Sequence, residues 1–87
     1  MSNPVRLTIL SREGCHLCEV AHRIALQLQS EHSIEVRIVD VDGDDLLRER
    51  YGMRVPVVLL DDIEQLSGNV TEEELRRAIK KRGEEDR

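Results

Sequence analysis

Two cysteines, Cys15 and Cys18, are separated by two residues and are the only cysteines of the chain. Residues 15–30 have the apolar spacing of an amphipathic helix, so both cysteines fall on its first turn. Side chains three apart on a helix have Cβ atoms about 5–6 Å apart, within reach of disulfide geometry. The unpaired N–H groups and the helix dipole at this end stabilise a thiolate. The pair therefore predicts thiol–disulfide exchange.

A disulfide across so short a loop stabilises a fold by only about 2 kcal/mol, against about 4.7 kcal/mol for a hundred-residue loop. A redox centre is therefore favoured over a structural staple, and over two unremarkable buried cysteines. We expect Cys15, at the helix terminus, to be the nucleophile and Cys18, one turn further in, to be the resolving thiol. His16, if protonated, would favour the thiolate of Cys15; the alternative is a solvent-facing helix residue.

A metal site is a competing interpretation. Cys15, Cys18 and His22 follow one helical stripe, and His32 could be a fourth donor if its loop folds back. Structural zinc usually draws its ligand pairs from separate segments, and no second pair exists in the sequence, so we predict no metal. Haem attachment is excluded because Glu19, not histidine, follows Cys18. We interpret His22 as a surface histidine.

The composition predicts one domain over residues 1–87, with an ordered core at about 5–82. A net charge of −5 gives no electrostatic footprint for nucleic acid. Tyr51 is the only aromatic residue, so no platform for stacking bases is present. No signal-peptide profile and no membrane-length apolar run occur, so no membrane association is expected. With both cysteines in one motif, these features predict a reducing cytoplasm as the location.

Strand and helix patterns alternate along the chain. We expect strands at 5–10, 34–41, 55–60 and 63–67, and helices at 15–30, from Asp44 to about 51, and at 72–82. Thr71 and Glu74 form a capping box before the last helix, and the tail beyond Gly83 is expected to fray. Connections through helices predict parallel strand pairs, whereas the short 61–62 link predicts an antiparallel hairpin. The order βαβαββα indicates an α/β fold with a central mixed four-stranded sheet and helices on both faces.

Pro56 lies at the start of a strand that should be central in the sheet, where proline has no hydrogen to donate. One interpretation is the permitted proline at the first position of a strand. The other is a cis Val55–Pro56 bond whose backbone faces the cysteines and pairs with an extended substrate. Proline alone favours the first, because only about 5–6 % of such bonds are cis.

Two stretches of the sequence resemble the glutaredoxin family of the thioredoxin superfamily. Residues 10–18 (Leu-Ser-Arg-Glu-Gly-Cys-His-Leu-Cys) are similar to the family's Tyr-Ser-Lys-Pro-Gly-Cys-Pro-Tyr-Cys. Residues 51–60 (Tyr-Gly-Met-Arg-Val-Pro-Val-Val-Leu-Leu) resemble the stretch that carries the superfamily's cis-proline. The Ser-Gly-Asn turn at 67–69 stands at the place of its glycine turn. The resemblance covers about residues 5–82 and implies a thioredoxin-like, glutaredoxin-type fold.

The resemblance also implies roles for single residues. Cys15 would be the nucleophile, Cys18 the resolving cysteine and Pro56 the cis-proline. Five further positions would meet glutathione. Arg12 would bind its glycine carboxylate and the backbone of Val55 its cysteinyl part, while its γ-glutamyl end would lie near Asn69, Val70 and Thr71. Between the cysteines, His-Leu replaces the family's Pro-Tyr.

The predicted function is that of a monomeric thiol–disulfide oxidoreductase in cell redox homeostasis. It would reduce protein or glutathione mixed disulfides, with a reductase or glutathione as electron donor and no tightly bound cofactor. Glutathione would then act as a co-substrate. One alternative is a protein in which Cys15 ligates a [2Fe–2S] cluster at a dimer interface. The other is a thioredoxin-fold interaction module without catalysis.

Overall fold

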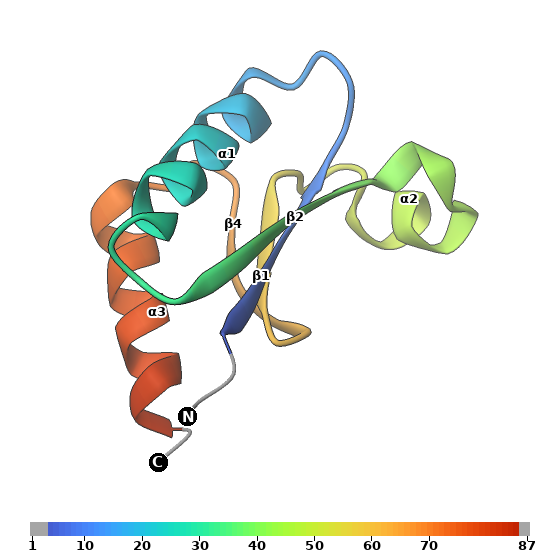
Figure 1. Ribbon diagram of the computed structural model, residues 1–87. Coiled ribbons are helices and arrows are strands. Elements are labelled where there is room, and N and C mark those ends of the chain that lie inside the picture. Colours follow the sequence, from blue (N-terminus) through green and yellow to red (C-terminus); the bar gives the residue numbers. More distant parts are fainter. Residues whose placement is uncertain (1–3, 86–87) are drawn as a thin grey trace.

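The computed structural model describes residues 4–85, which form a four-stranded mixed sheet with helices on both faces (Figure 1). The strands are β1 (Val5–Ser11), β2 (Ile34–Asp40), β3 (Val57–Leu60) and β4 (Ile63–Ser67). The helices are α1 (His16–Gln29), α2 (Asp45–Tyr51) and α3 (Glu72–Glu85), with a short 3₁₀ turn, η1, at Val41–Gly43. The predicted element order, mixed sheet and helix placement are confirmed.

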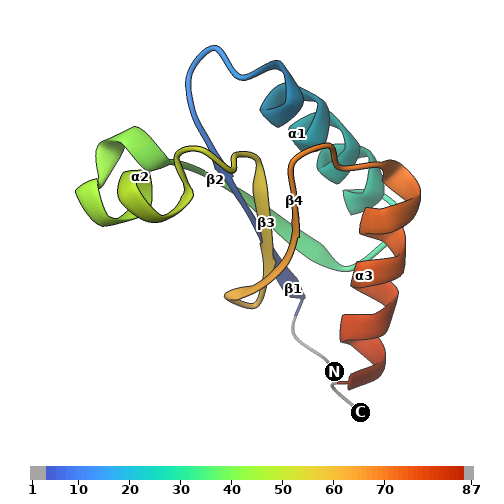
Figure 2. The same cartoon turned by 180° about the vertical axis from the view of Figure 1, so that it is seen from behind.

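The sheet has the strand order β2-β1-β3-β4. Strand β2 runs parallel to β1, and β3 runs antiparallel to both β1 and β4. Helices α1 and α3 lie side by side against one face, as both views show, and α2 lies at the far end of the sheet (Figures 1 and 2). The segments that carry the two cysteines and Pro56 therefore lie at one end of the sheet, where β1 and β2 finish and β3 begins.

The expectation that each helical crossover gives a parallel pair is wrong for the second one, since β3 is antiparallel to β1. The seven residues of α2 span only about 10 Å, whereas the seven of β2 span about 23 Å. A helix that short cannot carry the chain back along the sheet. Strand β3 therefore starts from the end at which β2 stops.

The alternation of side chains along the strands separates two apolar clusters. Leu7, Ile9, Val58 and Leu60 point to the face covered by α1 and α3 and are fully buried there. On the opposite face the buried members are Leu10, Val41 and Val57, against which α2 packs through Leu47 and Tyr51. Because alternate side chains of β1 and β3 point to opposite faces, the sheet packs against helices on both faces.

Two predicted boundaries shift by two residues or more. The third strand begins at Val57 rather than 55, after the Val55–Pro56 peptide. Helix α3 does not fray at Gly83 but continues to Glu85. Glycine keeps its backbone N–H, so it remains in a helix at a cost of about 1 kcal/mol relative to alanine. The predicted caps are confirmed, since Asp44 accepts the N–H groups of Leu46 and Leu47.

Candidate active site

The cysteines follow a tight turn at the end of β1. The N–H of Cys15 donates to the carbonyl of Arg12 at 3.2 Å, which closes a turn over residues 12–15. Gly14, the third residue of that turn, has a φ of +79°, a conformation that side-chain-bearing residues rarely adopt. The turn that delivers Cys15 therefore requires the backbone freedom of a glycine at position 14.

Cys15 is the N-cap residue of α1 and forms a disulfide with Cys18. The two Cα atoms are 5.2 Å apart, and the Sγ of Cys15 accepts the backbone N–H of Cys18 at 3.1 Å. Cys15 is half-buried, whereas Cys18 is only 4 % exposed. A sulfur at this position faces the unpaired N–H groups of a helix start, which lower the pKa of a thiol. The geometry agrees with an attacking Cys15 and a resolving Cys18.

The Val55–Pro56 peptide is cis, as the resemblance implied. The antiparallel register pairs Leu10 with Val57, so Pro56 lies at the same sheet end as the Cys15 turn. Pro56 is buried, and its carbonyl accepts the N–H of Gly68 at 2.9 Å. No hydrogen bond within residues 4–85 uses the backbone N–H or carbonyl of Val55. These two groups remain open for an extended substrate, and that role stays a prediction.

The turn before α3 contains the remaining predicted glutathione contacts. Gly68 has a φ of +78°, consistent with the predicted glycine turn. Asn69 is exposed, but Val70 is 4 % exposed and belongs to the core. Thr71 is engaged in the capping box: its hydroxyl accepts the N–H of Glu74 at 3.2 Å, and its own N–H donates to the Glu74 carboxylate. The structure therefore gives Val70 and Thr71 structural partners, and contact with glutathione stays a prediction.

Arg12 is bound within the protein. Its Nε and Nη2 donate to the two carboxylate oxygens of Asp42 at 3.0 and 2.7 Å, and its Nη1 donates to the carbonyl of Gly52 at 3.1 Å. The hydrogen bonds and positive charge of Arg12 lower the pKa of Asp42, and the same pairing raises the pKa of Arg12. The binding of a glutathione carboxylate by Arg12 stays a prediction, and it would have to compete with Asp42.

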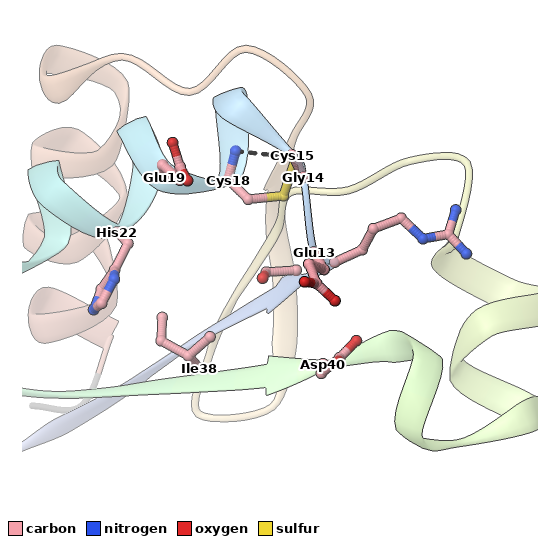
Figure 3. Close-up of a pocket in the computed structure, with 10 residues that line it drawn as sticks. Glu13, Gly14, Cys15, Cys18, Glu19, His22, Ile38 and Asp40 are labelled. Carbon is pink, nitrogen blue, oxygen red and sulfur yellow. Dashed lines mark hydrogen bonds between the residues drawn. A yellow bond between two sulfur atoms is a disulfide. The ribbon is translucent and has the colours of Figure 1, made fainter.

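A cavity of about 440 Å³ lies beside the disulfide, under the start of α1 (Figure 3). The two cysteines and the residues of the turn form its upper wall. His22 on α1 and Ile38 and Asp40 on β2 line the remainder. His22 is half-buried and points into this space, so the predicted surface histidine is only partly exposed and faces the cavity. In the sequence, only the spacing of His22 from the two cysteines on one helical stripe indicated that it lies near the site. Which face of α1 borders the cavity depends on how the helix packs against the sheet.

The cavity carries an excess of acidic groups. Glu13, Glu19 and Asp40 line it together with Arg12, whose charge is compensated by Asp42. Within residues 4–85, Glu13 makes no ion pair or hydrogen bond, and like Asp40 it lines the cavity. An anionic substrate would therefore meet like charge here.

His16 lies on the outside of α1. Its ring is 80 % exposed and stands 3.9 Å from the carboxylate of Glu19. The structure thus favours the solvent-facing alternative for His16. Among residues 4–85, no group of three histidine, cysteine or acidic residues is arranged to hold a metal ion. Within the same range, no helix is long and apolar enough to cross a membrane.

Comparison by sequence and by structure found proteins that are similar to this chain. An uncharacterised protein of Mycobacterium tuberculosis is 40 % identical over 85 residues, covering 91 % of this chain and 86 % of its own. The solution structure of a Nitrosomonas europaea protein has a TM-score of 0.76 and 29 % identity, covering 90 % of this chain and 94 % of its own. A mutant thioredoxin from Halobacterium salinarum has a TM-score of 0.71 and 26 % identity, over 91 % of this chain and 74 % of that one.

The family model described as "Glutaredoxin-like domain (DUF836)" matches residues 6–80, which include both cysteines, the cis-proline and the glycine turn. The sheet order, the disulfide at the start of α1 and the thioredoxin likeness agree with that match. The chain therefore belongs to the glutaredoxin-like domain family within the thioredoxin superfamily.

Proposed function

We propose that this protein is a dithiol oxidoreductase that reduces disulfides through Cys15 and Cys18. The observation that carries the proposal is the disulfide between a half-buried Cys15 at the N-cap and a buried Cys18 one turn later. Only the first sulfur is accessible to an incoming disulfide, and the second lies within bonding distance of it. The arrangement suits one attacking and one resolving thiol.

The reaction proceeds in two exchange steps. The thiolate of Cys15 attacks one sulfur of the substrate disulfide, forming a mixed disulfide and releasing the other substrate sulfur as a thiol after it gains a proton. Cys18 then loses its proton and attacks the Sγ of Cys15, which releases the second substrate thiol. The protein is left as the Cys15–Cys18 disulfide. A dithiol reductant, or two molecules of glutathione, returns both cysteines to thiols.

We propose protein disulfides as the preferred substrates, with glutathione mixed disulfides second. The open backbone groups of Val55 suit an extended polypeptide, which forms strand-like hydrogen bonds. Leu17 and Met53 are large exposed apolar side chains on the two segments that flank the site, with exposed fractions of 41 and 96 %. Glutathione has a net negative charge, and the acidic residues of the cavity disfavour it.

The test is a trapping experiment with serine variants. Cys18→Ser should form a stable mixed disulfide with a substrate protein through Cys15, whereas Cys15→Ser should form none. The wild-type protein should reduce insulin with dithiothreitol as reductant. Absence of both activities would leave a non-catalytic interaction module. A visible absorption spectrum of protein purified without oxygen, with the bands of a [2Fe–2S] cluster, would support cluster binding instead.

A further inference from the structure

Arg12 connects both halves of the candidate active site. Its backbone carbonyl accepts the N–H of Cys15 at 3.2 Å, so the residue closes the turn that delivers the attacking sulfur. Its guanidinium reaches in the other direction, to Asp42 in η1 and to the carbonyl of Gly52 after α2. Arg12 thus connects its own turn to two other segments at the same end of the sheet.

Gly52 leads directly to the segment that faces a substrate. It stands three residues before Val55, and the N–H of Arg54 donates to the carbonyl of Tyr51 at 2.8 Å, which closes a turn around it. The contact of Arg12 at Gly52 is therefore one tight turn away from the open backbone groups of Val55. Holding the Gly52 carbonyl in place limits the movement of that segment.

The backbone of Gly52 is closely surrounded. Gly52 is buried, and a Cβ atom there would lie 2.5 Å from the carbonyl oxygen of Arg48 and 3.6 Å from Nη2 of Arg12. The guanidinium therefore lies close against the backbone. A planar group with five N–H donors can serve Asp42 and Gly52 at once, whereas a lysine ammonium lacks this fixed geometry.

We propose that Arg12 is a positioning residue: it fixes the Val55–Pro56 segment relative to Cys15 and so determines how well a substrate disulfide docks. The proposal rests on the oxidoreductase function and adds a role for a residue that does not touch the reacting sulfurs. Arg12 and Asp42 together present no net charge to Cys15, so removing both leaves the thiolate nearly unaffected, whereas removing one exposes the charge of the other. The positioning role therefore predicts an effect on substrate binding that persists when both charges are removed together.

The test compares Arg12→Ala, Asp42→Ala and the double variant with insulin as substrate. Each single variant should raise KM by about three- to tenfold, the scale of one or two lost hydrogen bonds. Any shift of the Cys15 pKa should have opposite signs in the two single variants and be absent from the double variant. The double variant should raise KM no more than Arg12→Ala does, because Arg12→Ala already removes the contact that Asp42→Ala removes. Arg12→Lys should restore only part of the loss.

Arg76→Ala is the matched control, because Arg76 also binds two carboxylates, those of Glu31 and Glu72, but on α3. It should leave KM unchanged. A direct ligand role would give the opposite pattern: Asp42→Ala would free the guanidinium and improve turnover of a glutathione mixed disulfide, while Arg12→Ala would impair it. That result, or a change in kcat of the double variant as large as that in its KM, overturns the proposal.

A measurement without substrate separates this proposal from the oxidoreductase function. The amide hydrogen of Arg54, which donates to the carbonyl of Tyr51 in the turn around Gly52, should exchange about tenfold faster in Arg12→Ala and Asp42→Ala than in the wild type and Arg76→Ala, since the segment is released. An unchanged exchange rate at Arg54 overturns the positioning role, whatever the activity. A wild-type protein that reduces no disulfide would overturn the proposed function. The exchange rate would still show whether Arg12 restrains the Val55–Pro56 segment.

Discussion

Arg6 and Asp61 are joined by reciprocal hydrogen bonds between the start of β1 and the β3–β4 turn. The N–H of Arg6 donates to the Asp61 carboxylate at 3.0 Å, and the N–H of Asp61 donates to the carbonyl of Arg6 at 2.8 Å. Arg82 of α3 donates to the same carboxylate at 3.2 Å. Asp61 therefore links the sheet to the last helix at the end of the molecule remote from the cysteines.

The first prediction concerns acid stability. The hydrogen bond from the Arg6 N–H, and then Arg82, lower the pKa of Asp61, despite partial burial. A lowered pKa stabilises the fold above the unfolded value of about 3.9, and this stabilisation is lost as the pH falls through the folded pKa. Asp61→Asn should therefore lose less free energy of unfolding between pH 5 and 3 than the wild type, by urea denaturation. Parallel curves for both proteins would contradict this.

The second prediction concerns the hairpin turn. Asp61 and Asp62 have φ values of 49° and 69°, the positive pair that a two-residue turn of type I′ requires. Asp62→Gly should raise the free energy of unfolding by about 0.5 kcal/mol, because glycine adopts this conformation without a steric cost. Asp62→Ala should lower it by about 1 kcal/mol. The ion pair of Asp62 with Arg6 is exposed, so its loss changes the free energy of unfolding little. Equal stability of the glycine and alanine variants would refute the argument.

The third prediction concerns the two thiols after reduction. The Cys15 pKa should lie below the free value of about 8.5, because the sulfur caps α1, and Cys18 should titrate higher. Alkylation at neutral pH followed by peptide mapping should label Cys15 first. Preferential labelling of Cys18 would reverse the two assigned roles.

The fourth prediction concerns substrate charge. With Glu13 and Asp40 lining the cavity, the reduced protein should react faster with cystamine, a cation, than with dithiodiglycolate, an anion. The ratio of the two rate constants should fall in Glu13→Gln/Asp40→Asn and at high ionic strength. Glu35→Gln, at an exposed position on β2, is the control. If the variants left this ratio unchanged, the two carboxylates would not determine the preference for substrate charge.

The fifth prediction separates capping from ligand contact at Thr71. Thr71→Ala and Glu74→Ala each break the capping box, and Thr71→Ala should cost about 1 kcal/mol of stability. If Thr71 also contacts glutathione, Thr71→Ala should raise KM for a glutathione mixed disulfide more than Glu74→Ala does. Equal kinetics in the two variants would limit Thr71 to its role in the helix cap.

Local signals in the sequence were sufficient to predict the helices, the strands and the Cys15–Cys18 pair. The positions of Cys15 at the N-cap, of Asp44 and Thr71 at later caps, and of Gly14 in its turn depend on neighbours within four residues. The cis bond before Pro56 followed from family resemblance, since proline alone favoured trans.

Contacts between distant segments could not be predicted in this way. Arg12 meets partners 30 and 40 residues further along the chain, and nothing near it in the sequence indicates them. The enclosure of His22 and the direction of β3 depend on how α1 and α2 lie against the sheet. Both required the assembled fold.

The direction of β1 has a practical consequence. The strand begins at Val5 at one end of the sheet and delivers Cys15 at the other, and α3 finishes at the end at which β1 begins (Figure 1). A tether attached beyond either end of the described chain would leave the reactive sulfur facing away from its support. This domain could therefore be fused to a fluorescent reporter, or immobilised on an electrode, with its thiols directed toward the solution.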